Sequence, residues 1–295
     1  MRLTGIIGGF SFVLLASVPA WAADYMAPAD LCAVSDVNGK AHGQAGVYDA
    51  EESDGGQFQG VGSLSFPLGC MFGVQVDAGG GKFGEFEALG VGGHLFLRDP
   101  TTYLVGIHAT YEDWNLDSFG DHVGIWRVGP EAELYLANFS LEGWAGFQDG
   151  EEIDSSFFAR LTAAFYATEN LRLAAGWRHS DDFNSGVVTA EWQLSTMPMS
   201  LTAEGEAGED EFTSIMGGVK FYFGGSSRAL IDRHRQDDPG DGLFDFAGAA
   251  SDLVSAPEGG ECQDETVTDG CCTDSTALDG CCTDQTCGDF AGLTD

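Results

Sequence analysis

Short segments in which apolar and polar residues alternate follow one another from about residue 40 to residue 223. In one of them, Val105, Ile107 and Ala109 alternate with smaller or polar residues. A period of two is typical of a β-strand and not of a helix. We predict twelve strands, at about residues 40–49, 57–67, 70–79, 86–98, 102–112, 121–136, 139–148, 156–167, 171–179, 186–194, 200–208 and 212–223.

The lengths of these segments and of their connections indicate a membrane barrel. Most segments have about ten residues, the length that a tilted strand needs to cross a bilayer. A closed barrel is the sheet that leaves no backbone group unpaired in lipid. Tight turns such as Ala137-Asn138 alternate with longer, acidic connections such as 49–56 and 113–120. Short turns on one side and longer loops on the other are typical of outer-membrane barrels, so we predict an all-β, transmembrane, antiparallel up-and-down barrel over residues 40–223.

A soluble β-sandwich would also alternate, but the charged residues argue against it. The predicted outer faces carry almost no charge, whereas the charged residues of the strands share the opposite parity. We predict that these residues line the lumen and set its selectivity: Arg127, Glu131, Glu133, Glu142, Arg160, Arg172, Arg178, Glu191, Glu204, Glu206 and Lys220.

Basic and acidic rows of this kind permit two interpretations. They form either a constricted pore that sorts small solutes by size and charge, or an interior salt-bridge network that blocks passage. Twelve strands lie between filled small barrels and open porins, so strand number does not decide. Inward glycines such as Gly90, Gly106 and Gly176 leave room, which favours a narrow channel.

Pro130 falls inside the sixth predicted strand. Proline has no backbone donor for the ladder, so we expect a β-bulge at this position.

The N-terminus has the features of an export signal. Arg2 precedes an apolar stretch from Ile6 to Val18, and small residues stand at Ala20 and Ala22. We predict a secretory signal peptide over residues 1–22 and a periplasmic segment over residues 23–39. Exported cysteines encounter oxidising conditions, in which they can pair.

Two further segments follow the predicted barrel. Residues 224–240 include a short helix that begins near Ser226 and carries Arg228, Arg233, His234 and Arg235. This helix could dock on acidic lumen residues, contact anionic headgroups or simply be a solvated end of the barrel. Residues 241–295 form an acidic, Cys-rich tail that is too poor in apolar residues for a core, so we expect it to be largely disordered and to lie in the periplasm.

All eight cysteines are disulfide candidates. Cys32 and Cys70 are both expected at the periplasmic rim, where they could pair. The tail contains the other six in a ten-residue repeat that allows up to three disulfides of open connectivity. The tail lacks both Cys-x-x-Cys spacing and a nearby histidine, so we predict no metal site. The tail cysteines are Cys262, Cys271, Cys272, Cys281, Cys282 and Cys287.

Composition excludes some functions. The 295 residues include 47 Asp and Glu but only 12 Lys and Arg, giving a formal charge of −35. A chain without a basic face does not bind nucleic acid. None of the six histidines precedes a serine by two residues, the spacing that would place both on one face of a strand as a nucleophile and its base. We therefore expect neither an enzyme nor a cofactor.

The last predicted strand ends in Gly217-Gly218-Val219-Lys220-Phe221-Tyr222-Phe223. This segment, together with Arg98-Asp99-Pro100, 129–136, 170–173 and 230–239, resembles the porin-like outer-membrane β-barrel proteins of Gram-negative bacteria. The resemblance implies contact with outer-membrane lipid and an insertion signal at Phe221 and Phe223 that is read by the barrel-insertion machinery. It implies no defined substrate, and the chain continues about seventy residues beyond this strand.

These features predict an outer-membrane protein with both termini in the periplasm. Its expected function is passive passage of small solutes through a narrow channel. The alternative is a structural barrel with a closed lumen, whose acidic tail docks a periplasmic partner.

Overall fold

The computed structural model describes residues 32–50, 53–84, 86–116, 121–150, 155–181, 183–194, 197–209, 211–224, 228–237, 239–240 and 242–244. The predicted signal peptide and the six tail cysteines lie outside these residues. Twelve strands are present, in the predicted order: β1 (Asn38–Ala50), β2 (Ser53–Leu68), β3 (Phe72–Phe83), β4 (Phe86–Asp99), β5 (Tyr103–Leu116), β6 (Asp121–Leu136), β7 (Phe139–Gly150), β8 (Ser156–Thr168), β9 (Leu171–Ser180), β10 (Phe183–Gln193), β11 (Met199–Gly208) and β12 (Thr213–Phe223).

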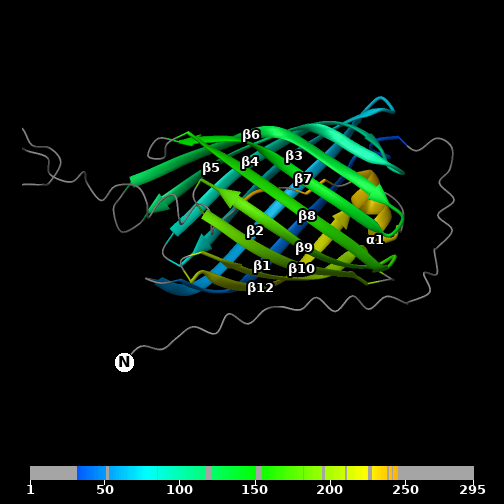
Figure 1. Cartoon of the computed structure of the whole chain (residues 1–295). Coiled ribbons are helices and arrows are strands. Elements are labelled where there is room, and N and C mark those ends of the chain that lie inside the picture. The colour runs from blue at the N-terminus through cyan, green and yellow to red at the C-terminus, as the bar shows by residue number, and fades with distance from the viewer. Residues whose placement is uncertain are drawn as a thin grey trace, which may run out of the picture.

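The strands form one closed antiparallel barrel (Figure 1). Each strand pairs with its neighbours in sequence, and β1 closes the barrel by pairing with β12 from Gly39↔Phe223 to Asp49↔Thr213. Closure removes the two free edges that an open sheet would expose. The predicted all-β barrel is confirmed.

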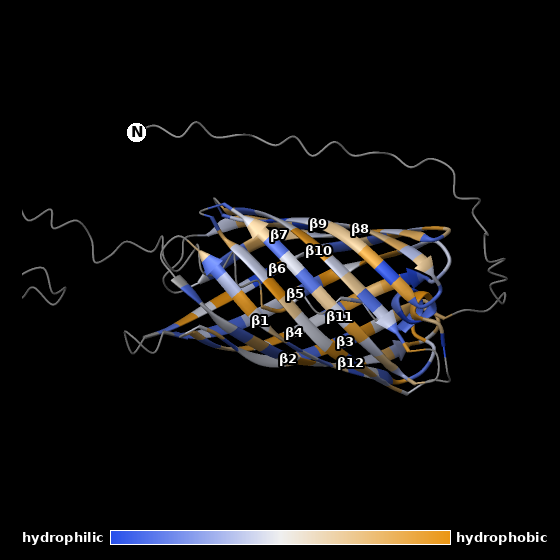
Figure 2. Cartoon of the chain, turned by 90° about the horizontal axis from the view of Figure 1, so that it is seen from below, coloured by the Kyte–Doolittle hydropathy of each residue, from blue (hydrophilic) through white to orange (hydrophobic). Residues whose placement is uncertain are grey.

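The outer surface of the barrel is apolar. Orange and paler residues alternate along the strands in Figure 2, as the period of two requires. Large apolar side chains such as Leu89 (69 % exposed), Phe147 (65 %) and Ile215 (64 %) point outward. An exposed apolar belt of this extent is typical of a surface in contact with lipid. The protein therefore has the architecture of a closed membrane-spanning β-barrel.

The two ends of the barrel differ. At the end that we call the turn end, tight turns such as Gly69–Met71 and Ala137–Asn138 join the strands, β1 begins and β12 finishes. At the opposite end, which we call the loop end, most of the connections between strands are shorter than the sequence predicts. Only residues 51–52 separate β1 from β2, because the polar residues Asp49 and Asp54 continue the ladder as a pair.

Pro130 does not produce the expected bulge. The pairs Val128↔Phe147 and Glu131↔Trp144 of β6 and β7 keep one register on either side of it. Pairing is interrupted only at Gly129 and Pro130, since Pro130 has no N–H to donate. The two strands stay close there, and a Cβ on Gly129 would lie 1.9 Å from the Ala145 carbonyl oxygen. The barrel's register shift occurs instead between β8 and β9, at Tyr166 and Thr168.

A disulfide joins the N-terminal segment to the turn end. Cys32 is bonded to Cys70 in the β2–β3 turn, which confirms the expected pair. The Ala33 amide also donates to the Cys70 carbonyl over 2.7 Å. Ala33 and Val34 then pack into a buried cluster with Phe96, Leu104 and Tyr135. The segment before β1 is thus part of the folded barrel.

Two short helical elements follow β12. α1 (Leu230–Asp232) continues into a π-helical turn, η1 (Arg233–Asp237). Both lie at the turn end of the barrel (Figure 1). Within the described residues, no helix is long and apolar enough to cross a membrane.

We predict that Leu161→Arg, in the middle of β8, lowers the free energy of unfolding by roughly 2–4 kcal/mol, because it places a charge on the lipid face near the bilayer midplane. Met71→Arg is the matched control: Met71 is as exposed as Leu161 (60 % and 56 %) but lies in a turn, where the cost should be about 0–1 kcal/mol. Urea unfolding of the barrel in lipid vesicles measures both. Equal losses would contradict the assignment of this surface to lipid.

Candidate functional site

The lumen is occupied by the chain's own C-terminal segment. We call the described residues 228–237, 239–240 and 242–244 the lumen segment. Polar as well as apolar members of it are buried: Leu230 is 0 % exposed, Arg233 5 %, Asp237 4 % and Phe244 5 %. Burial of arginine and aspartate is costly unless they are paired, so their partners define the site.

α1 docks on the turns at the turn end. The Leu230 amide donates to Asn170 Oδ1 over 3.2 Å, and the Ile231 amide donates to the Glu169 carbonyl over 3.1 Å. Gln193 at the end of β10 donates to the Arg228 carbonyl (2.6 Å) and accepts from Arg233 Nε (3.1 Å). These bonds hold the start of the lumen segment against the β8–β9 turn and β10.

The basic residues of the helix bind groups that the sequence did not identify. Arg235 donates to the Phe139 carbonyl over 2.8 Å, and its guanidinium lies 5.2 Å from the Tyr135 ring centroid. Arg233 lies 4.8 Å from the Tyr222 ring centroid. Aromatic faces attract guanidinium groups. Docking on an acidic lumen residue, one of the possibilities left open for this helix, is found for His234, whose Nε2 is 3.5 Å from Glu191 Oε2.

η1 also binds the segment before β1. Asp237 Oδ1 accepts from the amide (3.2 Å) and the hydroxyl (2.6 Å) of Ser35, while Arg228 donates to Asp237 Oδ2 over 3.0 Å. Gln236 donates to the Cys32 carbonyl over 3.2 Å. Nearby, partial burial and the Glu169 carboxylate raise the pKa of Asp232 above its ordinary value. The two ends of the barrel domain are therefore tied together at one mouth.

Beyond the helix, the lumen segment binds charged side chains of the barrel wall. Lys40 and Gln75 donate to the Pro239 carbonyl over 2.7 and 3.1 Å. Arg160 donates to the Gly242 carbonyl over 2.7 Å. The Phe244 amide donates to Glu112 Oε1 over 3.1 Å. Backbone groups of the segment thus pair with charged side chains of β1, β5 and β8 and with the neutral amide of Gln75 in β3.

The last described residues pack at the loop end. Leu243 and Phe244 belong to a buried apolar cluster with residues from the loop ends of several strands. The Phe244 ring lies 6.1 Å from Phe83 and 6.4 Å from Trp114, centroid to centroid. The cluster also contains Tyr48, Val61, Ala88, Val123, Ile125, Phe183 and Phe212.

This packing corrects the expectation that inward glycines leave a passage. A Cβ on Gly90 would lie 3.1 Å from the Phe244 ring and 3.4 Å from Leu243. A Cβ on Gly106 would lie 2.8 Å from Glu131 Oε1, and one on Gly176 would lie 2.8 Å from the Leu161 carbonyl oxygen. The space that these glycines leave is taken up by the lumen segment and by neighbouring strands.

The predicted lumen residues lie in the barrel interior, buried or half-buried, and most of them contact one another. Arg172 donates to both carboxylate oxygens of Glu142 (2.8 and 2.7 Å), and Arg178 contacts Glu206 (2.8 Å) and Glu204 (3.1 Å). Lys220 contacts Glu191 over 2.9 Å. Their role in selectivity stays a prediction.

The remaining predicted lumen residues have other partners. Arg127 contacts Glu112 over 3.2 Å, and Arg160 binds the lumen segment. Glu131 contacts His94, and Glu133 accepts from the Tyr135 hydroxyl over 2.7 Å. Sequence reasoning missed Glu112 and His94, although both have the inward parity of their strands.

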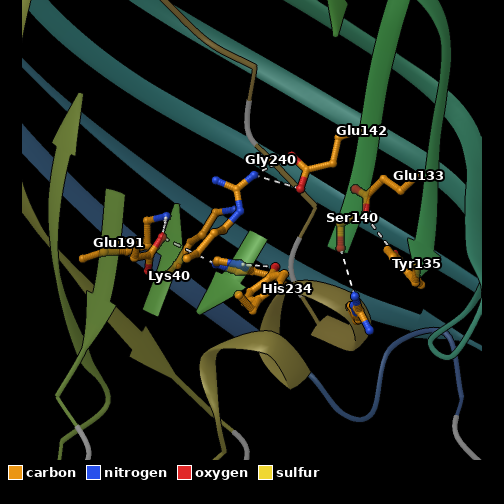
Figure 3. Close-up of a pocket in the computed structure, with 12 residues that line it drawn as sticks. Lys40, Glu133, Tyr135, Ser140, Glu142, Glu191, His234 and Gly240 are labelled. Carbon is orange, nitrogen blue, oxygen red and sulfur yellow. Dashed lines mark hydrogen bonds and ion pairs between the residues drawn. The ribbon is translucent and has the colours of Figure 1, made fainter. Parts of the chain in front are cut away.

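A cavity of about 110 Å³ remains between the helix and the charged wall (Figure 3). His234 and Gly240 of the lumen segment line it, as do side chains of both signs from the strands. The acidic residues Glu133, Glu142 and Glu191 and basic residues that include Lys40 and Arg172 line this space together. The cavity is a polar remnant of the lumen.

His94 lies at the centre of a buried polar cluster. Its Nε2 is 3.2 Å from Asp77 Oδ2 and its Nδ1 is 2.8 Å from Glu131 Oε2. Its ring stacks on His108 at 3.6 Å, and His108 stacks on Trp144 at 4.0 Å. Asp77, His94 and His108 offer ligand atoms within 4.8 Å of one another, so they could hold a metal ion. The absence of a metal site stays a prediction, and a metal ion bound at this cluster would contradict it.

No family model matches the chain, and no curated protein matches it. Solved structures of outer-membrane proteins do. The KdgM porin in complex with disordered oligogalacturonate has a TM-score of 0.49 at 7% identity, covering 63% of this chain and 99% of its own. Omp33 of Acinetobacter baumannii has a TM-score of 0.43 at 12% identity and covers 64% of this chain and 99% of its own. Outer-membrane phospholipase A of Escherichia coli has a TM-score of 0.43 at 12% identity and covers 63% of this chain and 92% of its own. Porins and an enzyme both occur here, so the likeness selects no function.

We predict that His94→Ala lowers the free energy of unfolding by about 3 kcal/mol or more, because it leaves two buried carboxylates without this partner. His122→Ala removes an imidazole that also contacts a carboxylate, Asp113, but is 61 % exposed, and should cost about 1 kcal/mol or less. Urea unfolding compares the two variants. A similar loss for both would show that the buried cluster contributes nothing special to stability.

Proposed function

We propose that this protein is an outer-membrane barrel closed by its own C-terminal segment, and that it serves as an anchor and not as an open pore. The observation that carries this proposal is the course of the lumen segment, which has buried residues from Leu230 at the turn end, through Asp237, to Leu243 and Phe244 at the loop end. Of the two interpretations of the lumen charges, the contacts support the interior network.

The bonds of the lumen segment oppose its departure. Lys40, Arg160 and Glu112 would each lose a partner if the segment left. The apolar side chains of Leu230, Leu243 and Phe244 would return to water, at about 1.5–3 kcal/mol for each fully buried side chain. Both effects favour the closed state.

A gated channel is the second candidate function. The observation in its favour is the polar cavity beside the helix, where Arg172, Lys220 and the facing glutamates would line a path if the lumen segment moved. A docking partner for the tail, and the absence of enzymatic activity, remain predictions that the described residues do not test.

Planar-bilayer recording distinguishes closure from an open pore. We expect the full chain to show no steady conductance, whereas a variant that ends at Gly224 conducts, because it lacks the lumen segment. A variant that ends at Phe244 is the matched control, and it should be silent because it keeps the segment. Heat-modifiable gel mobility verifies that all three variants form barrels. Steady conductance of the full chain equal to that of the shortest variant would refute closure.

In the shortest variant, Arg172→Glu tests the predicted selectivity. Reversing one charge in the opened lumen should shift its ion preference towards cations, since the lumen potential becomes more negative. Reversal potentials in a salt gradient measure the shift, with the unsubstituted shortest variant as the reference. Unchanged selectivity would remove Arg172 from the residues that set it.

A further inference from the structure

The lumen segment crosses the barrel in one direction. β12 ends at Phe223 at the turn end, where Phe223 pairs with Gly39 at the start of β1. α1 and η1 then lie against residues of that same end, including Glu169 and Asn170. The segment therefore enters the lumen at the mouth where the barrel domain begins and ends.

Successive contacts of the segment move along the barrel axis. Pro239 is held by Lys40, which lies two residues into β1 from the turn end. Gly242 is held by Arg160 and lies close to His108 and Trp144, which are in the middle parts of β5 and β7. A Cβ on Gly242, whose φ is +65°, would lie 2.4 Å from His108 Cε1, so the chain passes the wall closely at this level.

The last described residue is at the opposite mouth. Phe244 packs against Phe83, the final residue of β3 at the loop end, and against Trp114, two residues before the end of β5. Phe183, the first residue of β10, and Phe212, in the connection before β12, belong to the same cluster. Within the described residues, the segment thus runs from the turn end to the loop end without turning back.

We propose that the barrel displays the Cys-rich tail, residues 245–295, on the loop side of the membrane, which is the cell exterior. This display function rests on the proposed function, because a filled lumen leaves no room for the chain to return. It replaces the periplasmic position expected from the sequence.

The chemistry of the tail fits this position. No Lys or Arg follows Arg235, so 51 acidic and neutral residues with six cysteines follow Phe244. Disulfides persist in an oxidising exterior. β1 begins and β12 ends at the turn end, and that end of the barrel is expected from the sequence to lie in the periplasm, so in this proposal the loop end faces outward.

Cleavage in intact cells tests the proposal. A site for a sequence-specific protease is inserted after Ser255 in the full chain, and the protease is added outside Gram-negative cells that produce it. We expect the same fraction to be cut in intact cells as in cells with opened outer membranes. The matched control carries the same site after Ala27, in the segment that Cys32 ties to the turn end, and should be cut only after opening. Protection of the Ser255 site in intact cells would overturn the display.

A deletion of residues 228–244 removes the path through the lumen. We expect the Ser255 site of this variant to become protected in intact cells. If the deletion prevents barrel assembly, a second measurement is antibody binding to an epitope placed after Asp295 of the full chain. We expect the antibody to stain intact cells, and the absence of staining would contradict the display. A silent full chain with a protected Ser255 site would refute display and leave closure standing, whereas a full chain with steady conductance would refute closure and, with it, the premise of display.

Discussion

Complete backbone pairing around a closed sheet is the constraint on which the rest of this structure depends. In hydrocarbon an unpaired backbone donor or acceptor costs several kcal/mol, so a membrane sheet must close on itself. The β1–β12 ladder provides that closure over eleven residue pairs. Because side chains alternate across the sheet, closure also forces the polar half of every strand into a shared interior. An apolar exterior and a crowded, charged lumen are therefore two consequences of one constraint.

The charged side chains of the interior find partners of two kinds. Some charged side chains pair with one another, as Arg172 does with Glu142. Others bind the backbone of the lumen segment, as Arg160 does at the Gly242 carbonyl. A segment that supplies carbonyls and amides to charged walls, and apolar side chains to the cluster at the loop end, completes the interior in the way that a central core completes a soluble domain.

The sequence predicts the barrel well because its signals are local and repeated. Parity alone placed Arg127 and Glu191 in the interior, and the even number of cysteines suggested the Cys32–Cys70 bond. The filled lumen was not predictable in the same way. Phe244 and Glu112 are 132 residues apart, and no local sequence pattern at either residue indicates that they are in contact. Pro130 failed as a bulge marker because its effect depends on how closely Gly129 and Gly146 let two strands approach, which no single strand reveals.

Fluorescence quenching of single-tryptophan variants tests the central claim most directly, namely that the outer face contacts hydrocarbon and the lumen is filled. Trp192 is 53 % exposed on the outside, whereas Trp114 is 0 % exposed beside Phe244. In vesicles with brominated acyl chains, a variant that keeps only Trp192 should be quenched by the lipid and not by aqueous acrylamide. A variant that keeps only Trp114 should resist both. Acrylamide quenching of Trp114 would contradict a filled lumen, and acrylamide quenching of Trp192 without lipid quenching would contradict the membrane barrel itself.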